Sequence, residues 1–152
     1  ALCRLSGRGF DVIVVTNQAA VGRGLVTREI LDEIHRRMVG AVAAGGGRIR
    51  DIFICPHRPE DGCGCRKPAP GLLLEAQRRH RIDLSAAVMI GDSAADIECA
   101  RAADVPTSVL VRTGSGEEAG RELSSRGVFP SFIADDLSQA ADWIIAPNGM
   151  RH

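Results

Sequence analysis

Two short pairs of soft metal ligands lie close together between residues 54 and 71. Cys55 and His57 form a C-x-H pair, and Cys63 and Cys65 form a C-x-C pair. Three thiolates and one imidazole complete a tetrahedral Zn²⁺ site and leave no position for a catalytic water. The sequence therefore predicts a structural zinc site, which would fix a loop rich in proline and glycine and poor in apolar side chains.

The alternative is that these residues are separate thiols beside an unrelated histidine. Zinc is favoured because a C-x-C pair has poor geometry for a disulfide. Cys3 and Cys99 are the two cysteines outside the group. We expect all the thiols to be reduced and the protein to be cytoplasmic, because no secretory signal peptide is recognisable.

Length and composition limit the possible functions. The 152 residues have the length of a single domain, with 45% apolar residues, 25% charged residues and a formal net charge of zero. Such a chain can bury a core but has no electrostatic bias towards nucleic acid. The basic cluster at 78–81 is short and indicates a solvated helix end, and no apolar run is long enough to cross a bilayer. We expect a monomer that binds neither nucleic acid nor membrane.

Buried strand patterns alternate with amphipathic helical patterns along the chain, which predicts an α/β fold with a parallel sheet. Strands are expected at residues 11–16, 49–55, 87–90, 108–111 and 132–133. Helices are expected at 2–5, from a cap at Thr27 to 42, and at 70–79, 96–103 and 137–145, with a loop and short helix in 114–126.

The helix that follows Thr27 is predicted to end at the glycines 45–47. Its spacing predicts an apolar face made by Ile30, Leu31, Ile34, Met38 and Val42.

Polar side chains are expected at the carboxyl ends of the strands, where α/β proteins bind ligands. Thr16 and Asn17 end the first predicted strand, Lys67 follows the zinc loop, and Asp92 and Asp96 follow the third strand. A hydroxyl and an amide can bind phosphoryl oxygens, a lysine can neutralise their charge, and a carboxylate can hold Mg²⁺. Each feature alone is weak, since Asp92 could belong to a simple turn and Lys67 could be a solvated surface charge. Together they predict a phosphate site.

These motifs resemble those of the haloacid-dehalogenase-like phosphohydrolases. T-N-Q at 16–18, K-P at 67–68 and G-D-S-x-x-D at 91–96 are similar to the second, third and fourth motifs of that family. The zinc loop resembles that of the branch containing the histidinol-phosphate phosphatases and the D-glycero-D-manno-heptose 1,7-bisphosphate phosphatases. C-R-K-P-A-P-G at 65–71 is more similar to the heptose enzymes. The resemblance covers residues 10 to about 114.

The resemblance implies a three-layer, Rossmann-like parallel sheet and a Mg²⁺-dependent phosphomonoesterase that works through an aspartyl-phosphate intermediate. Thr16 and Asn17 would bind the transferring phosphoryl group, and Lys67 would stabilise its charge. Asp92 would help to coordinate Mg²⁺. Asp96 would orient Lys67 or the water shell of the metal.

The implied substrate is a phosphorylated small molecule of the sugar-bisphosphate type, with histidinol phosphate as the alternative. Arg66 could reach a second phosphate or a sugar hydroxyl; the alternative for this side chain is simple solvent exposure.

The family's D-x-D motif, which carries the nucleophile and the general acid/base, is not found before Asp11. In the family its strand lies centrally, between the strands predicted here at 11–16 and 87–90. We therefore interpret residues 1–152 as a single haloacid-dehalogenase-like domain that lacks its first central strand, and we expect this chain to be inactive alone. The alternative is a non-catalytic, zinc-containing phosphate-binding module.

Overall fold

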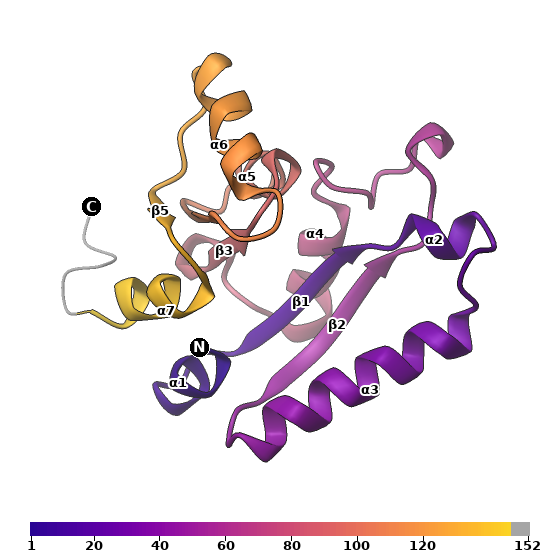
Figure 1. Ribbon diagram of the computed structural model, residues 1–152, viewed down its shortest axis with the longest axis horizontal. Helices are drawn as coiled ribbons and strands as arrows, with labels where there is room; N and C mark the ends of the chain where they lie inside the picture. Colours follow the sequence, from indigo (N-terminus) through magenta and orange to yellow (C-terminus); the bar gives the residue numbers. More distant parts are fainter. Residues whose placement is uncertain (147–152) are drawn as a thin grey trace. The chain divides into compact units, whose positions relative to one another are not determined.

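The computed structural model describes residues 1–146 (Figure 1). The chain divides into two compact units, one spanning Leu2–Arg66 and the other running from Lys67 onwards. Each unit contains its own parallel sheet, of β1-β2 in the first and β3-β4-β5 in the second. Strands and helices alternate along the chain, so the predicted α/β class is confirmed.

The first unit is a parallel strand pair with a crossover helix. Its elements are α1 (Leu2–Gly7), β1 (Val12–Asn17), α2 (Ala19–Gly22), α3 (Arg28–Ala44), β2 (Ile49–Cys55) and a short 3-10 helix (Pro59–Asp61). Figure 1 shows α3 running beside β2, and the two elements are in contact. Thr27 caps α3 by accepting a hydrogen bond from the Ile30 N–H at 3.3 Å, and Gly45 is its C-cap, as predicted.

The apolar face predicted for α3 is only partly correct. Leu31 is 3% exposed, whereas Ile30 and Ile34 are 53% and 52% exposed. At roughly 100° per residue, Leu31, Met38 and Val42 share one narrow stripe, and the two isoleucines lie to its side. The covered stripe is therefore narrower than the spacing of apolar residues indicated.

The second unit is a layered α/β unit. Its elements are α4 (Gly71–His80), a 3-10 helix (Leu84–Ala86), β3 (Val88–Gly91), α5 (Ala94–Ala102), β4 (Thr107–Val111), α6 (Gly116–Ser125), β5 (Phe132–Ala134) and α7 (Leu137–Ile145). The helix α5 begins two residues before the predicted start, and Pro70 is the residue before α4 rather than part of it.

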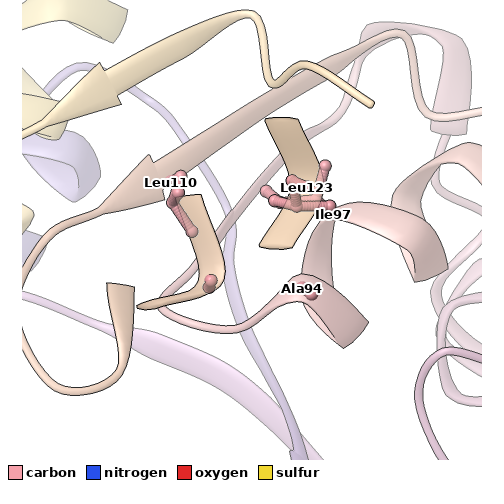
Figure 2. Packing of buried hydrophobic residues seen from close by; sticks show 5 residues of the cluster. Ala94, Ile97, Leu110 and Leu123 are labelled. Carbon is pink, nitrogen blue, oxygen red and sulfur yellow. The ribbon is translucent and has the colours of Figure 1, made fainter. Parts of the chain in front are cut away.

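Alternating side chains of β4 supply apolar contacts on both faces of this sheet. Leu110 packs against helices α5 and α6 through Ile97 and Leu123, in a cluster with Ala94 and Ala119 (Figure 2). Val109 and Val111 belong to a second cluster with residues of β5 and α7. There Trp143 stacks on Phe132 with 5.0 Å between ring centroids. The unit is thus held by a core on each face of its sheet.

Two predictions about the organisation of the chain remain predictions. One is that residues 1–152 form a single domain, and the other is that this domain lacks its first central strand. Residues 147–152 of the predicted domain lie outside the described residues. Within residues 1–146, no helix has the length and apolar character that crossing a membrane requires.

Candidate functional site

The four predicted zinc ligands come together in the first unit. Their ligand atoms all lie within 4.8 Å of one another. Cys65 Sγ is 3.1 Å from Cys55 Sγ, 3.5 Å from Cys63 Sγ and 3.2 Å from His57 Nδ1. A tetrahedron with zinc–sulfur bonds of 2.3 Å has sulfur–sulfur edges of about 3.7 Å. The type and the spacing of the donors therefore fit a single Zn²⁺ ion.

The backbone brings these ligands together with local hydrogen bonds. Cys55 is the last residue of β2 and is fully buried. The loop then turns through the 3-10 helix, where the Arg58 N–H donates to Asp61 Oδ2 at 2.8 Å. Gly62 has a φ of 61°, a left-handed conformation that favours glycine, and it returns the chain towards Cys63.

The thiols of the cluster differ in acidity. Burial opposes ionisation of Cys63, but hydrogen bonds with Cys65 and Cys55 and from the backbone outweigh it and lower its pKa to about 7. Burial, together with hydrogen bonds to the other two thiols, raises the pKa of Cys65 to about 12. Zinc would hold both as thiolates, since a bound cation favours the charged form.

The predicted phosphate-binding end of β1 lies next to the zinc loop. Asn17 is the strand partner of Cys55 in the β1–β2 pair. The backbone N–H of Gln18 donates to the Cys55 carbonyl oxygen at 2.7 Å. The Gln18 side-chain amide donates to Thr16 Oγ1 at 3.1 Å. Gln18 was not predicted as a site residue, although it is part of the T-N-Q motif.

In the second unit, Lys67 and Asp96 form a buried ion pair. Lys67 Nζ lies 2.7 Å from Asp96 Oδ1, and the two side chains are 10% and 6% exposed. Ser93 caps α5 and donates to Asp96 Oδ2 through its N–H at 3.1 Å and its hydroxyl at 2.7 Å. A Cβ atom at Gly91 would lie 2.2 Å from the carboxylate, so this position requires glycine. The Asp96 carboxylate is therefore fixed, and it holds the ammonium group of Lys67.

Cys99 is a buried thiol close to this ion pair that was not predicted to belong to the site. Its Sγ donates to the Ala69 carbonyl oxygen at 3.3 Å. Burial raises its pKa to about 11, with opposing effects from Lys67 and Asp96. A protonated, inert thiol at this position fills space beside the ion pair.

The Asp92 carboxylate is held by the loop between β4 and α6. The Ser115 N–H donates to Asp92 Oδ2 at 3.1 Å. Gly114 has a φ of +64°, and a Cβ atom there would lie 2.1 Å from Asp92 Oδ2. This close approach requires glycine both for its conformation and for the absence of a side chain. Sequence reasoning missed this contact.

Comparison with known proteins identifies the family. The HAD-hydrolase-like family model matches residues 64–140. The chain is 40% identical over 145 residues to a D-glycero-beta-D-manno-heptose-1,7-bisphosphate 7-phosphatase of Pseudomonas aeruginosa, which covers 95% of this chain and 79% of that relative. The chain belongs to the haloacid-dehalogenase-like phosphatases. A relative of the same name from Escherichia coli K12 is 34% identical over 152 aligned residues. That alignment covers 95% of this chain and 71% of the relative.

A solved structure of this phosphatase family has a similar fold. It is the D,D-heptose 1.7-bisphosphate phosphatase of B. bronchiseptica complexed with magnesium and phosphate. The TM-score is 0.85 at 36% identity, with 95% of this chain and 79% of that chain covered. The resemblance inferred from the three motifs and the zinc loop is confirmed.

Within the phosphatase chain, the predicted site residues fall into two groups. Thr16, Asn17 and the zinc ligands belong to the first unit. Lys67, Asp92 and Asp96 belong to the second unit. That the two groups bind one phosphoryl group remains a prediction. Arg66 donates to the His57 carbonyl oxygen at 3.4 Å, and its role towards substrate also remains a prediction.

Proposed function

We propose that this phosphatase-family chain contributes the substrate-binding and Mg²⁺-binding residues for removing the C7 phosphate of a heptose 1,7-bisphosphate, with the nucleophile coming from the family's D-x-D motif. The main support is the agreement among relatives, because proteins 34–40% identical over nearly the whole chain bear the name of this activity. The motif at 65–71, which resembles the heptose enzymes more than the histidinol ones, supports the same substrate class.

In the proposed site, this chain binds and polarises the transferring phosphoryl group. Thr16 and Asn17 would donate hydrogen bonds to its oxygens, and Lys67 would neutralise charge that develops on them. Asp96 would act as a positioning residue, because its contact with the Lys67 ammonium group fixes where that charge lies. Arg66 would bind the second phosphate or a sugar hydroxyl of the substrate.

Asp92 would hold Mg²⁺ at the end of β3. A carboxylate at a strand end fits this ion, which binds proteins through one or two carboxylates together with substrate phosphates. When bound, Mg²⁺ would neutralise charge on the phosphoryl oxygens. The hydrogen bond from the Ser115 N–H to Oδ2 would hold the Asp92 carboxylate in place for this ion.

Zn²⁺ is proposed as the structural ion of the first unit, held by Cys55, His57, Cys63 and Cys65. The close approach of the four ligand atoms supports this assignment. We also propose a cytoplasmic protein, because three of its five cysteines gather in a cluster suited to a metal and therefore to reduced thiols. A monomer is proposed as well.

Gly114→Ala is expected to weaken Mg²⁺ binding roughly tenfold, because the new methyl group must displace the Asp92 carboxylate from the Ser115 N–H. Mn²⁺ binding followed by electron paramagnetic resonance measures this without turnover. Gly40→Ala is the control, since a Cβ there meets nothing within 4 Å in the middle of α3. Equal metal affinity in the wild type and in Gly114→Ala would show that this loop does not set the position of Asp92.

The proposed function is tested by phosphate release with Mg²⁺ from heptose 1,7-bisphosphate and from histidinol phosphate. Both this chain and one extended upstream by about 40 residues, enough for a strand, loop and helix, are assayed. We expect the heptose substrate to be preferred. We also expect activity to require the extension, because no D-x-D spacing occurs in the 152 residues. A preference for histidinol phosphate would mean that histidinol phosphate, not the heptose bisphosphate, is the substrate. Inactivity of both the short and the extended chain would favour a non-catalytic binding module.

A further inference from the structure

Gln18 links the zinc loop to the side chain proposed to bind phosphate. Its backbone N–H donates to the carbonyl oxygen of the zinc ligand Cys55 at 2.7 Å. Its side-chain amide donates to Thr16 Oγ1 at 3.1 Å. Thr16, Gln18 and Cys55 all belong to the first unit. Cys55 is buried, and Thr16 and Gln18 are partly buried. One residue thus has one contact in each of the two sites.

The zinc loop also packs closely against the turn that follows Gln18. Gly22 ends α2, and a Cβ atom there would lie 2.4 Å from the carbonyl oxygen of Pro56. Pro56 lies between the zinc ligands Cys55 and His57. The segment from Gln18 to Gly22 therefore bonds to the backbone of Cys55 at one end and packs against the backbone of Pro56 at the other.

The direction of the side-chain bond determines what Thr16 can do. A hydroxyl group has one proton to donate and two lone pairs with which to accept. Because Gln18 donates to Oγ1, the Thr16 proton stays available for an anion. A donor at position 18 therefore prepares Thr16 to donate to a phosphoryl oxygen, whereas an acceptor at that position would take up the proton.

We infer that Gln18 is a positioning residue that couples the structural zinc loop to phosphate binding, by orienting the hydroxyl of Thr16. The inference rests on the proposed function of Thr16. Its consequence is that zinc acts on the substrate affinity although it takes no part in the chemistry. Loss of zinc would release the Cys55 carbonyl, then Gln18, and then the hydroxyl of Thr16.

Affinity for inorganic phosphate, followed by ³¹P nuclear magnetic resonance on zinc-loaded protein, provides the first test. Gln18→Ala should weaken binding about three- to tenfold, the effect of one neutral hydrogen bond. Gln18→Glu should weaken it roughly tenfold or more, because a carboxylate accepts the Thr16 proton and repels the anion. Gln77→Ala, the same change on α4, is the control. The zinc-to-protein ratio should stay the same in all three variants.

Removal of zinc by a chelator completes the cycle. Phosphate affinity should fall in the wild type and fall less in Gln18→Ala, where the route through the side chain is already broken. Unchanged phosphate affinity in Gln18→Ala, or an equal effect of zinc removal in both proteins, would overturn the inference while leaving the proposed function intact.

Amide hydrogen exchange provides a measurement that does not depend on phosphate. Zinc removal should speed exchange at the Gln18 N–H, which bonds to Cys55, more than at Val14 within β1. If the wild type bound no phosphate, the proposed function of Thr16 would fail, and faster exchange at Gln18 would still support the link to the zinc loop. Equal exchange at Gln18 with and without zinc would disprove that link.

Discussion

Cys65→Ser is expected to abolish zinc binding and to lower the free energy of unfolding of the first unit by on the order of 5 kcal/mol. The reason is that Cys65 Sγ contacts the ligand atoms of all three other residues, at 3.1–3.5 Å. The loop has few apolar side chains, so a bound metal would supply most of the energy that orders it. Serine is a poor zinc ligand and cannot replace the thiolate.

Zinc content by elemental analysis and amide exchange in β1 and β2 measure the two effects. Cys3→Ser is the control, because this thiol is only half-buried and its contact, with the Val42 carbonyl oxygen, is long at 3.8 Å. We expect Cys3→Ser to keep zinc and to change stability by less than about 1 kcal/mol. A Cys65→Ser protein with one zinc per chain and wild-type exchange would contradict a structural zinc site.

The cluster of four candidate metal ligands could be predicted from sequence because all four come from one short segment, Cys55 to Cys65. Their spacing is itself the geometric constraint, and no tertiary contact has to be known. The bounds of β2 and α7 were also predicted correctly, as Ile49–Cys55 and Leu137–Ile145. Both have local patterns: β2 ends in the apolar run at 52–55 just before the loop, and α7 is an apolar helix.

Other features depend on contacts between distant residues and could not be predicted in this way. The helix α2 has only four residues, and the turn it makes is packed against Pro56 of the zinc loop. The approach of Gly114 to Asp92 has no local signature beyond a glycine after a strand. Ser93 did have one, since S-x-x-D at 93–96 matches a capping box, which the structure contains.

The Lys67–Asp96 pair could be predicted only in part. The family resemblance pointed to both residues, but the sequence did not show that they are in contact. The sequence offered two partners for Asp96, the lysine or the water shell of a metal. The ion pair at 2.7 Å shows contact with the lysine. The position of this pair relative to Thr16 and Asn17 remains a prediction, since the two groups belong to different units.

Lys67→Met is expected to lower the free energy of unfolding by about 3–5 kcal/mol and to remove measurable phosphate binding. Methionine keeps much of the length of the lysine side chain but leaves the Asp96 carboxylate, 6% exposed, without its cation. Breaking a buried pair in this way costs more than the pair itself contributes, because one charge remains buried and uncompensated. Denaturant unfolding and ³¹P titration with inorganic phosphate measure the two losses separately.

The double variant Lys67→Met/Asp96→Asn distinguishes structure from function at this pair. Removing both charges should restore most of the stability, because no buried charge is left unpaired, but phosphate binding should stay lost because the ammonium group is absent. Arg28→Met is the control, since the Arg28–Asp32 pair is 58% and 51% exposed and should contribute less than about 1 kcal/mol. Phosphate affinity that recovered together with stability would mean that Lys67 only supports the fold. Stability that recovered alone would assign to Lys67 the charge that binds the phosphoryl group.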